Sequence, residues 1–170
     1  MDLTEFPLYI CSVKYPEMRF ELKEIEGFPG EEAHVYSVVM EGDTTSLLEQ
    51  FFDENGKYKK DIRKIRSKIL TMTLYEGCRK EFFKEGEGKW GDGVVALKYS
   101  GRLRLYGIYF NRSVILFGSG GYKPPSVRAY QDYPPLNEKA QQMREIAKII
   151  YNRIKDGELK FNHDGTLTND

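Results

Sequence analysis

The sequence predicts an α+β domain in which helices pack on one face of an antiparallel sheet. Its 170 residues, 40% of them hydrophobic, suffice to fill one core and are too few for two full-sized domains. Segments with the two-residue alternation of strands occur together with segments whose apolar residues repeat every three to four positions, as in helices. Three of the strand segments are separated by two-residue turns, which is typical of antiparallel hairpins.

The first half of the chain is predicted to supply three strands and two helices. Pro16 and the turn at 27–30 separate the strands. The second helix is marked by an apolar stripe from Ile62 to Met72, in steps of three and four residues. Its remaining surface is rich in lysine and arginine. The predicted elements are strands near 8–14, 19–25 and 34–40 and helices at 46–52 and 58–75.

The second half is predicted to form two hairpins and a long last helix. The glycine-rich segment 85–93 is expected to be a loop, and the glycines after Phe117 are expected to lead out of the sheet. Gly157 ends the last helix, and the polar tail from Asn162 to Asp170 is expected to fray. The predicted elements are strands at 94–99, 102–110 and 113–117 and a helix at 136–154.

Charge is distributed unevenly along this chain, although its net charge is zero. Residues 1–56 hold 3 Lys/Arg against 13 Asp/Glu, whereas residues 57–90 hold 11 against 5. Between Gly93 and Gln131 there are six cations and no carboxylate. A local positive field of this kind suits an anionic partner. The open alternative is that the acidic and basic segments pair with one another across the fold.

Several classes of protein are excluded by the sequence or poorly supported. The longest apolar stretch, 114–117, is far too short to cross a membrane, and the acidic N-terminus does not resemble a secretory signal. Neither the two cysteines nor the two histidines have metal-ligand or nucleophile–base spacing. The glycines at 118–121 lack the spacing of a nucleotide phosphate loop. We therefore expect a cytoplasmic protein without metal or cofactor and without membrane attachment.

The remaining candidate is a cationic strand face beside a Gly/Pro-rich loop. Alternation along the middle strand of the hairpins places Arg102, Arg104, Tyr106 and Ile108 on one face. Arginine donates two parallel hydrogen bonds to phosphate, and tyrosine stacks on unpaired bases, so this combination favours RNA. The candidate RNA-binding residues are Lys98, Arg102, Tyr106, Arg112 and Tyr122.

From His34 onward the predicted order is strand, helix, helix, three strands and helix. This order, with the Arg-Leu-Arg-Leu-Tyr segment that leads through a turn into 113–125, resembles the RelE/HigB-like toxins of type II toxin–antitoxin systems. The similarity covers about residues 34–155. It implies a β-α-α-β-β-β-α domain at 34–157, an acidic N-terminal β extension at 1–33 and a C-terminal tail at 158–170.

The resemblance also implies an activity, namely metal-independent, ribosome-dependent cleavage of mRNA in a bacterium. The 2′-hydroxyl would attack the adjacent phosphate, which requires a base, cations for the transition state and an acid for the leaving oxygen. Arg104 (or Arg102) resembles the family's strand arginine and Lys123 the cation after the last strand, while Arg128 or Tyr130 is the later group. Lys123, its pKa lowered by neighbouring cations, is expected to be the base, although acid and base are interchangeable.

The same resemblance implies a partner and leaves two other functions open. The partner would be an antitoxin, a small DNA-binding protein encoded nearby. A non-catalytic relative, such as a ParE-like gyrase poison, needs no cluster around Lys123. A plain protein- or nucleic-acid-binding module would carry a cationic face neutralised by the acidic N-terminal segment. One departure from the family pattern is that two prolines, rather than a second basic residue, follow Lys123.

Overall fold

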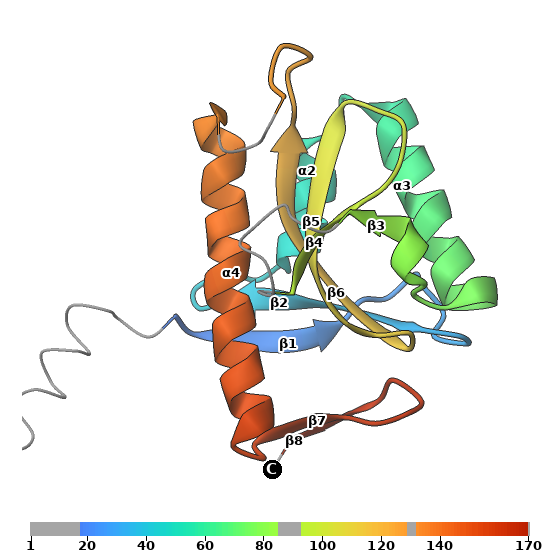
Figure 1. Cartoon of the computed structure of the whole chain (residues 1–170), viewed down its shortest axis with the longest axis vertical. Coiled ribbons are helices and arrows are strands. Elements are labelled where there is room, and N and C mark those ends of the chain that lie inside the picture. The colour runs from blue at the N-terminus through green and yellow to red at the C-terminus, as the bar shows by residue number, and fades with distance from the viewer. Residues whose placement is uncertain (1–17, 85–92, 129–131, 170) are drawn as a thin grey trace, which may run out of the picture.

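The computed structural model describes residues 18–84, 93–128 and 132–169, which form a six-stranded mixed sheet with helices on both faces (Figure 1). The strands are β1 (Phe20–Glu24), β2 (His34–Met40), β3 (Phe83–Lys84), β4 (Val94–Leu97), β5 (Leu103–Asn111) and β6 (Val114–Tyr122). The helices are α2 (Leu47–Glu54), α3 (Lys59–Thr71) and α4 (Pro134–Lys155). The predicted α+β class is confirmed, and so is most of the predicted element order. The strand expected at 8–14 lies outside the described residues.

Two features of the sheet correct the predictions. Its order is β1-β2-β6-β5-β4-β3, and β2 runs parallel to β6, so the sheet is mixed and not antiparallel throughout. The helices also cover both faces, with α4 on one side and α2 and α3 on the other (Figure 1). The parallel pair arises because α2 and α3 form a long connection between β2 and the later strands, and parallel neighbours require such a connection.

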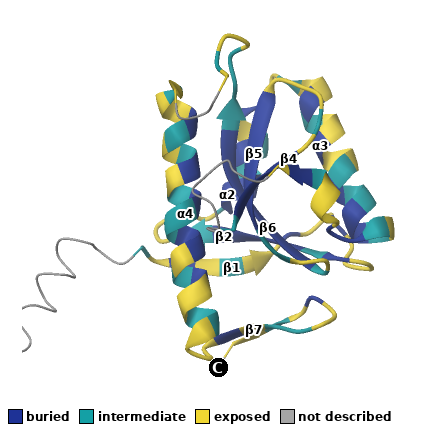
Figure 2. Cartoon of the chain, in the orientation of Figure 1, coloured by how far each residue is buried: buried dark blue, intermediate teal, exposed yellow. Residues whose placement is uncertain are grey.

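Alternation along β5 and β6 divides the core into two layers. Tyr106 and Ile108 pack with α4, whereas Leu103 and Leu105 pack with α3 and its neighbours. Both strands are buried over most of their length, as the dark blue centre of Figure 2 shows. Because a sheet covered on both faces is close-packed, the backbones of β5 and β6 are held in place.

Local interactions explain why α2 and α3 form where they do. Ser46 caps α2 through a capping box, because its Oγ accepts a hydrogen bond from Glu49 N at 3.1 Å while the Glu49 carboxylate accepts one from Ser46 N. The ammonium of Lys23, 3.1 Å from Glu49, lowers the pKa of that carboxyl group further. Helix α3 buries Ile65 and Ile69 and continues as a π turn at Met72–Glu76. Together these helices fix the position of the residues that precede α3.

Strand β6 is longer than predicted. It continues through its glycines to Tyr122, where the prediction ended at 117. The glycines allow close contact, since a Cβ on Gly120 would overlap the backbone carbonyl of Arg104, and a Cβ on Gly118 would overlap Met143 of α4. The segment expected to leave the sheet therefore extends the β5–β6 pairing to the end that carries the candidate site.

Both ends of the described chain belong to the folded structure. Strand β1 pairs with β2 along its whole length, so the predicted N-terminal extension shares the main sheet. Residues 162–169, which were expected to fray, form the turn and the second strand of a hairpin in which β7 (Leu159–Phe161) pairs with β8 (Leu167–Asn169). Tyr36 of β2 donates a hydrogen bond of 2.9 Å to Gly165 O in its turn, and Leu159 is buried. These contacts correct the prediction of a frayed tail.

Candidate functional site

One end of the sheet gathers three parts of the chain that are distant in sequence. The start of β5, the end of β6 and the first residues of α3 meet there, at the top of Figure 1. Leu103 pairs with Tyr122 and Arg104 with Gly121, and Lys123 N donates to Arg102 O at 2.8 Å. We call the residues that meet here the basic corner, which consists of Tyr58, Asp61, Tyr99, Arg102, Tyr122 and Lys123.

Two parallel aromatic rings lie at the basic corner. Tyr58 and Tyr122 stack with centroids 5.5 Å apart and an angle of 2° between the rings. The Arg102 guanidinium lies 4.8 Å from the centroid of Tyr58, and the Lys57 ammonium lies 5.2 Å from it. Both distances are within the range of cation–π attraction. Rings held in this way, with cations beside them, present a surface for a flat, negatively charged ligand.

A buried carboxylate orients the exposed arginine of this corner. Arg102 Nε donates a 3.1 Å hydrogen bond to Asp61 Oδ2, and the side chain of Asp61 is 6% exposed while that of Arg102 is 57% exposed. Asp61 therefore holds one edge of the guanidinium, and the other edge lies toward solvent. Tyr99 supports this arrangement, because its hydroxyl accepts a 2.7 Å hydrogen bond from Leu103 N. Burial raises the pKa of Tyr99, so this phenol is neutral at physiological pH.

Three of the four predicted catalytic residues lie within the described chain. Arg104 is opposite Gly121, so Lys123, two residues further along, is its diagonal neighbour across the β5–β6 pair, about 7–8 Å away between Cα atoms. Alternation along β5 assigns Arg104 to the α4 face of the sheet, and Lys123 follows the last residue of β6. Arg104 is 9% exposed, and Lys123 Nζ donates to the backbone oxygen of the exposed Arg128 at 3.4 Å. Tyr130 lies outside the described residues.

The two strand arginines lie on different sides of the sheet, which corrects their predicted placement on one face. Arg102 contacts Tyr58 and Asp61 of the α3 layer. Arg104, two residues before the core residue Tyr106, belongs to the α4 layer. Arg102 precedes the first residue of β5 and so lies outside the regular strand. The alternation of side chains along β5 therefore does not predict on which face of the sheet Arg102 lies.

Two other predicted RNA-binding residues lie apart from the basic corner, and a third, Lys98, directly precedes Tyr99 of the corner. Tyr106 is fully buried under α4, with no surface on which a base could stack, which corrects the prediction for it. Arg112 lies at the opposite end of the β5–β6 hairpin, about 25–30 Å away along the nine-residue strand, where its Nη2 donates to Glu76 O at 3.2 Å. Lys98 is exposed after β4. Of the predicted set, Arg102 and Tyr122 belong to the corner.

Sequence reasoning missed the contribution of α3 to this site. Tyr58 and Asp61 appeared only as members of a cationic helix, and Tyr99 as the end of a strand. The sequence held one signal of this contribution. Tyr58 and Asp61 are three residues apart, which places them on one side of the first turn of α3. Nothing in the sequence indicated that Asp61 would be buried, because an acidic residue in a first turn usually interacts with the helix dipole at the surface.

The positive surface continues from the basic corner along α3. A shallow hollow of about 340 Å³ is lined by Gly56, Lys59, Ile62, Arg63 and Arg66. The Arg66 guanidinium lies 4.1 Å from the ring centroid of Phe52, which holds it against α2. Asp61, the acidic residue of α3, is buried against Arg102. The outer face of this helix therefore extends the cationic surface.

The acidic N-terminal segment does not neutralise the exposed cations of the later strands. Glu24, Glu41 and Glu49 form ion pairs with His34, Arg19 and Lys23, all within the same segment. Within the described part of the chain, no carboxylate of residues 18–56 pairs with Lys98, Arg102, Arg112 or Arg128. The alternative that the acidic and basic segments pair is therefore wrong for these four residues.

The described residues offer little support for other kinds of site. Among them, no group of three or more His, Cys, Asp and Glu side chains is arranged to hold a metal ion. Cys78 is fully buried, which raises the pKa of its thiol to about 12 and makes it a poor nucleophile. No helix in the described ranges combines the length and apolar character that crossing a membrane requires.

Comparisons with known proteins identify no relative. No protein-family model matches the chain, and no curated protein and no solved structure matches it either. The basic corner and the residues beside it are therefore the features from which a function can be inferred.

Proposed function

We propose that the basic corner binds single-stranded RNA and that the chain is a RelE/HigB-like toxin, a metal-independent mRNA endonuclease that acts on the ribosome. The observation that carries the proposal is the convergence of Arg102, Arg104 and Lys123 at one end of the β5–β6 pair, beside the stacked Tyr58 and Tyr122. The element order from β2 to α4 differs from the order that the resemblance implies by one short strand, β3, which precedes β4.

Binding would use the rings and cations of the corner together. An unpaired base would stack on the face of the Tyr122 ring that does not meet Tyr58, and such stacking contributes about 1–3 kcal/mol per base. The outward edge of the Arg102 guanidinium suits a phosphate, because Asp61 fixes the plane of the group before any ligand arrives. Cations along α3 would attract the rest of the strand.

Cleavage would take place at the same end of the sheet, at Lys123. The 2′-oxygen forms a bond to the adjacent phosphorus while the bond from phosphorus to the 5′-oxygen breaks, which leaves a 2′,3′-cyclic phosphate and a 5′-hydroxyl. In this scheme Lys123 accepts the 2′-hydroxyl proton, Arg104 stabilises the extra negative charge and Arg128 or Tyr130 protonates the leaving oxygen. The assignment of acid and base remains interchangeable.

The partners follow from the same proposal. The RNA would be mRNA held in the ribosome, in the cytoplasm of a bacterium. The antitoxin would be a small DNA-binding protein encoded nearby, and an acidic segment of it would cover the basic corner by charge complementarity.

One observation favours a second, non-catalytic function. Arg104 is only 9% exposed, so in the described conformation its guanidinium offers little surface to a phosphate. A module that binds RNA at the basic corner without cutting it, or a ParE-like protein that binds gyrase through the same fold, does not require Arg104 to reach its ligand. RNA binding without cleavage would distinguish the binding module from the endonuclease.

Replacing Arg102 by glutamine is expected to weaken RNA binding, because the charge is lost while the amide can still donate to Asp61. A plot of log affinity against log salt has a negative slope, and the loss of one phosphate contact should make that slope shallower by about 0.7. The measurement is fluorescence anisotropy of a labelled single-stranded RNA over a range of salt concentrations.

The matched control is Arg112→Gln, which removes the same charge from the far end of the hairpin. Its affinity and salt slope should equal those of the unmodified protein. Equal losses in both variants would mean that only overall charge matters, and the basic corner would no longer be the binding site.

A further inference from the structure

Strand β1 is one edge of the main sheet, and its backbone groups alternate between β2 and the outside. Glu41 N donates to Arg19 O at 2.9 Å, and Ile25 N donates to Val35 O at 2.9 Å, on either side of the strand. In an antiparallel pair, residues that exchange hydrogen bonds occur at every second position. The N–H and C=O groups of Phe20, Leu22 and Glu24 therefore point away from β2.

This outward row is available for pairing with another strand. Among the residues that the structure describes, no strand pairs with the outer side of β1. Exposed edges of this kind are templates for strand addition. The row is symmetric about Leu22, since Phe20 and Glu24 lie two residues to either side of it.

We propose that β1 pairs antiparallel with β1 of a second copy of this chain, with Leu22 on the two-fold axis. This register places Leu22 opposite Leu22 and Phe20 opposite Glu24 of the second copy. All outward N–H and C=O groups of the three residues then find partners, and two six-stranded sheets join into one.

The charges of β1 are self-complementary in this register. Glu21 lies opposite Lys23 of the second copy, twice per dimer, and opposite charges in such cross-strand positions stabilise the pairing. Both side chains are exposed. Lys23 already lies 3.1 Å from Glu49, so in the dimer it would lie between two carboxylates. This symmetry favours a second copy over an unrelated extended peptide.

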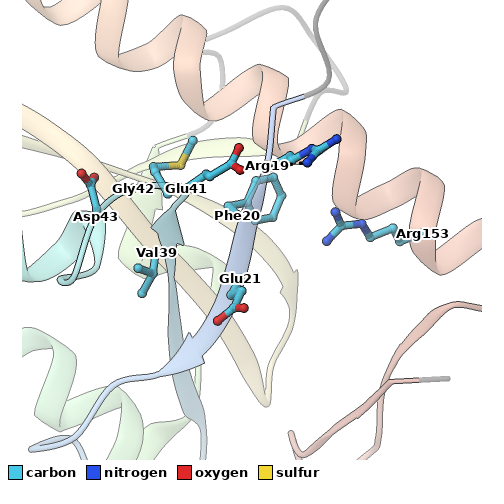
Figure 3. Close-up of a pocket in the computed structure, with 9 residues that line it drawn as sticks. Arg19, Phe20, Glu21, Val39, Glu41, Gly42, Asp43 and Arg153 are labelled. Carbon is cyan, nitrogen blue, oxygen red and sulfur yellow. Dashed lines mark ion pairs between the residues drawn. The ribbon is translucent and has the colours of Figure 1, made fainter. Parts of the chain in front are cut away.

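The opposite face of β1 is complementary as well. The guanidinium of Arg153 reaches from α4 to 5.0 Å from the ring centroid of Phe20 (Figure 3). Glu24 of the second copy, which lies 2.7 Å from His34 of its own chain, would lie opposite Phe20, on the strand face that Arg153 approaches. A pocket of about 600 Å³ lies beside Phe20 and Arg153, and its lining also includes Glu21, Glu41 and Asp43.

A pairing of five residues per strand is short, so the dimer should be weak and concentration-dependent. Sedimentation velocity of the full chain should show a monomer at low micromolar concentration and a dimer at the highest attainable concentration. Glu21→Lys places like charges opposite one another at two positions, and the dissociation constant should rise by about tenfold or more.

Two further variants complete the test. Leu22→Pro removes an outward N–H without removing a β1–β2 hydrogen bond, and it should also give a monomer. Glu26→Lys makes the same charge change in the turn after β1, outside the register, and should leave the dimer intact. A chain that stays monomeric at every concentration, as it would if its own residues 1–17 occupied this edge, would overturn the proposal. So would a dimer that Glu21→Lys does not weaken.

Discussion

Alanine in place of Gly120 is expected to destabilise the protein by about 3 kcal/mol, because a Cβ there would overlap backbone atoms. The nearest atom is the carbonyl oxygen of Arg104, and the Cα of Leu105 lies 3.0 Å from the same position. Neither can move without disrupting the β5–β6 pairing on which the basic corner depends. Urea unfolding followed by circular dichroism measures the loss.

Gly121→Ala is the control for that prediction. A Cβ at Gly121 would have Leu136 Cδ2 as its nearest neighbour, at an ordinary van der Waals distance of 3.8 Å. Its effect should stay within about 1 kcal/mol. If the two variants unfold at the same urea concentration, the close approach of β5 and β6 at Gly120 is wrong, and the placement of Arg104 beside Lys123 is wrong with it.

Alanine in place of Lys123 is expected to slow RNA cleavage by about a hundredfold, which corresponds to about 3 kcal/mol in the transition state. The loss has two sources, since the variant lacks both a proton acceptor and a positive charge near the reacting phosphate. The measurement is the rate of cleavage of mRNA on programmed ribosomes. Growth arrest on expression in a bacterium should disappear in parallel.

Lys148→Ala serves as the matched control, because this exposed lysine lies on α4 and takes no part in the candidate site. It should cleave at the rate of the unmodified protein. A folded Lys123→Ala variant with full activity would remove Lys123 from the mechanism. If the unmodified protein and the Lys123→Ala variant both bound RNA and neither cleaved it, the non-catalytic function would be the better explanation.

The elements that the sequence predicted well are those with a strong local period. The apolar stripe of α3 and the alternation of β5 each specify one element and one buried face. Partners of strands are not specified in this way, so the parallel β2–β6 pair and the second helical layer were missed. One sign was present, because the continuous apolar run at 114–117 is typical of a strand buried on both faces.

The glycines of β6 show why its end was misplaced. Glycine usually weakens a strand, and several in a row predicted an exit from the sheet. Here Gly120 is needed because the backbone carbonyl of Arg104 approaches too closely for any side chain, while at Gly118 the end of the flexible Met143 side chain fills the space of a Cβ. Such close approach depends on segments remote in the sequence, and no local pattern reveals it.

The C-terminal hairpin was missed although its signal is local. Asp164 and Gly165 are a strong turn pair, and Gly165 has the positive φ of 88° that such turns require. The flanking strands are only three residues long, which is too short for alternation to stand out. Their stability comes from Leu159 and from the hydrogen bond of Tyr36, which only the fold supplies.

The candidate site was predicted in part for the same reasons. Arg102, Tyr122 and Lys123 were found because charge and aromatic content are visible in the sequence. Tyr58 and Asp61 were missed because their role depends on how α3 packs against the start of β5. Tyr106 was assigned wrongly because alternation indicates a shared face and does not tell whether a helix covers it.

The chemical ends of RNA fragments produced by the purified protein on ribosomes test the central claim most directly. Attack by the 2′-hydroxyl predicts a 2′,3′-cyclic phosphate on the upstream fragment and a 5′-hydroxyl on the downstream one, both absent with Lys123→Ala. Fragments that end in a 3′-hydroxyl and a 5′-phosphate, or mRNA that stays intact with the unmodified protein, would contradict the account.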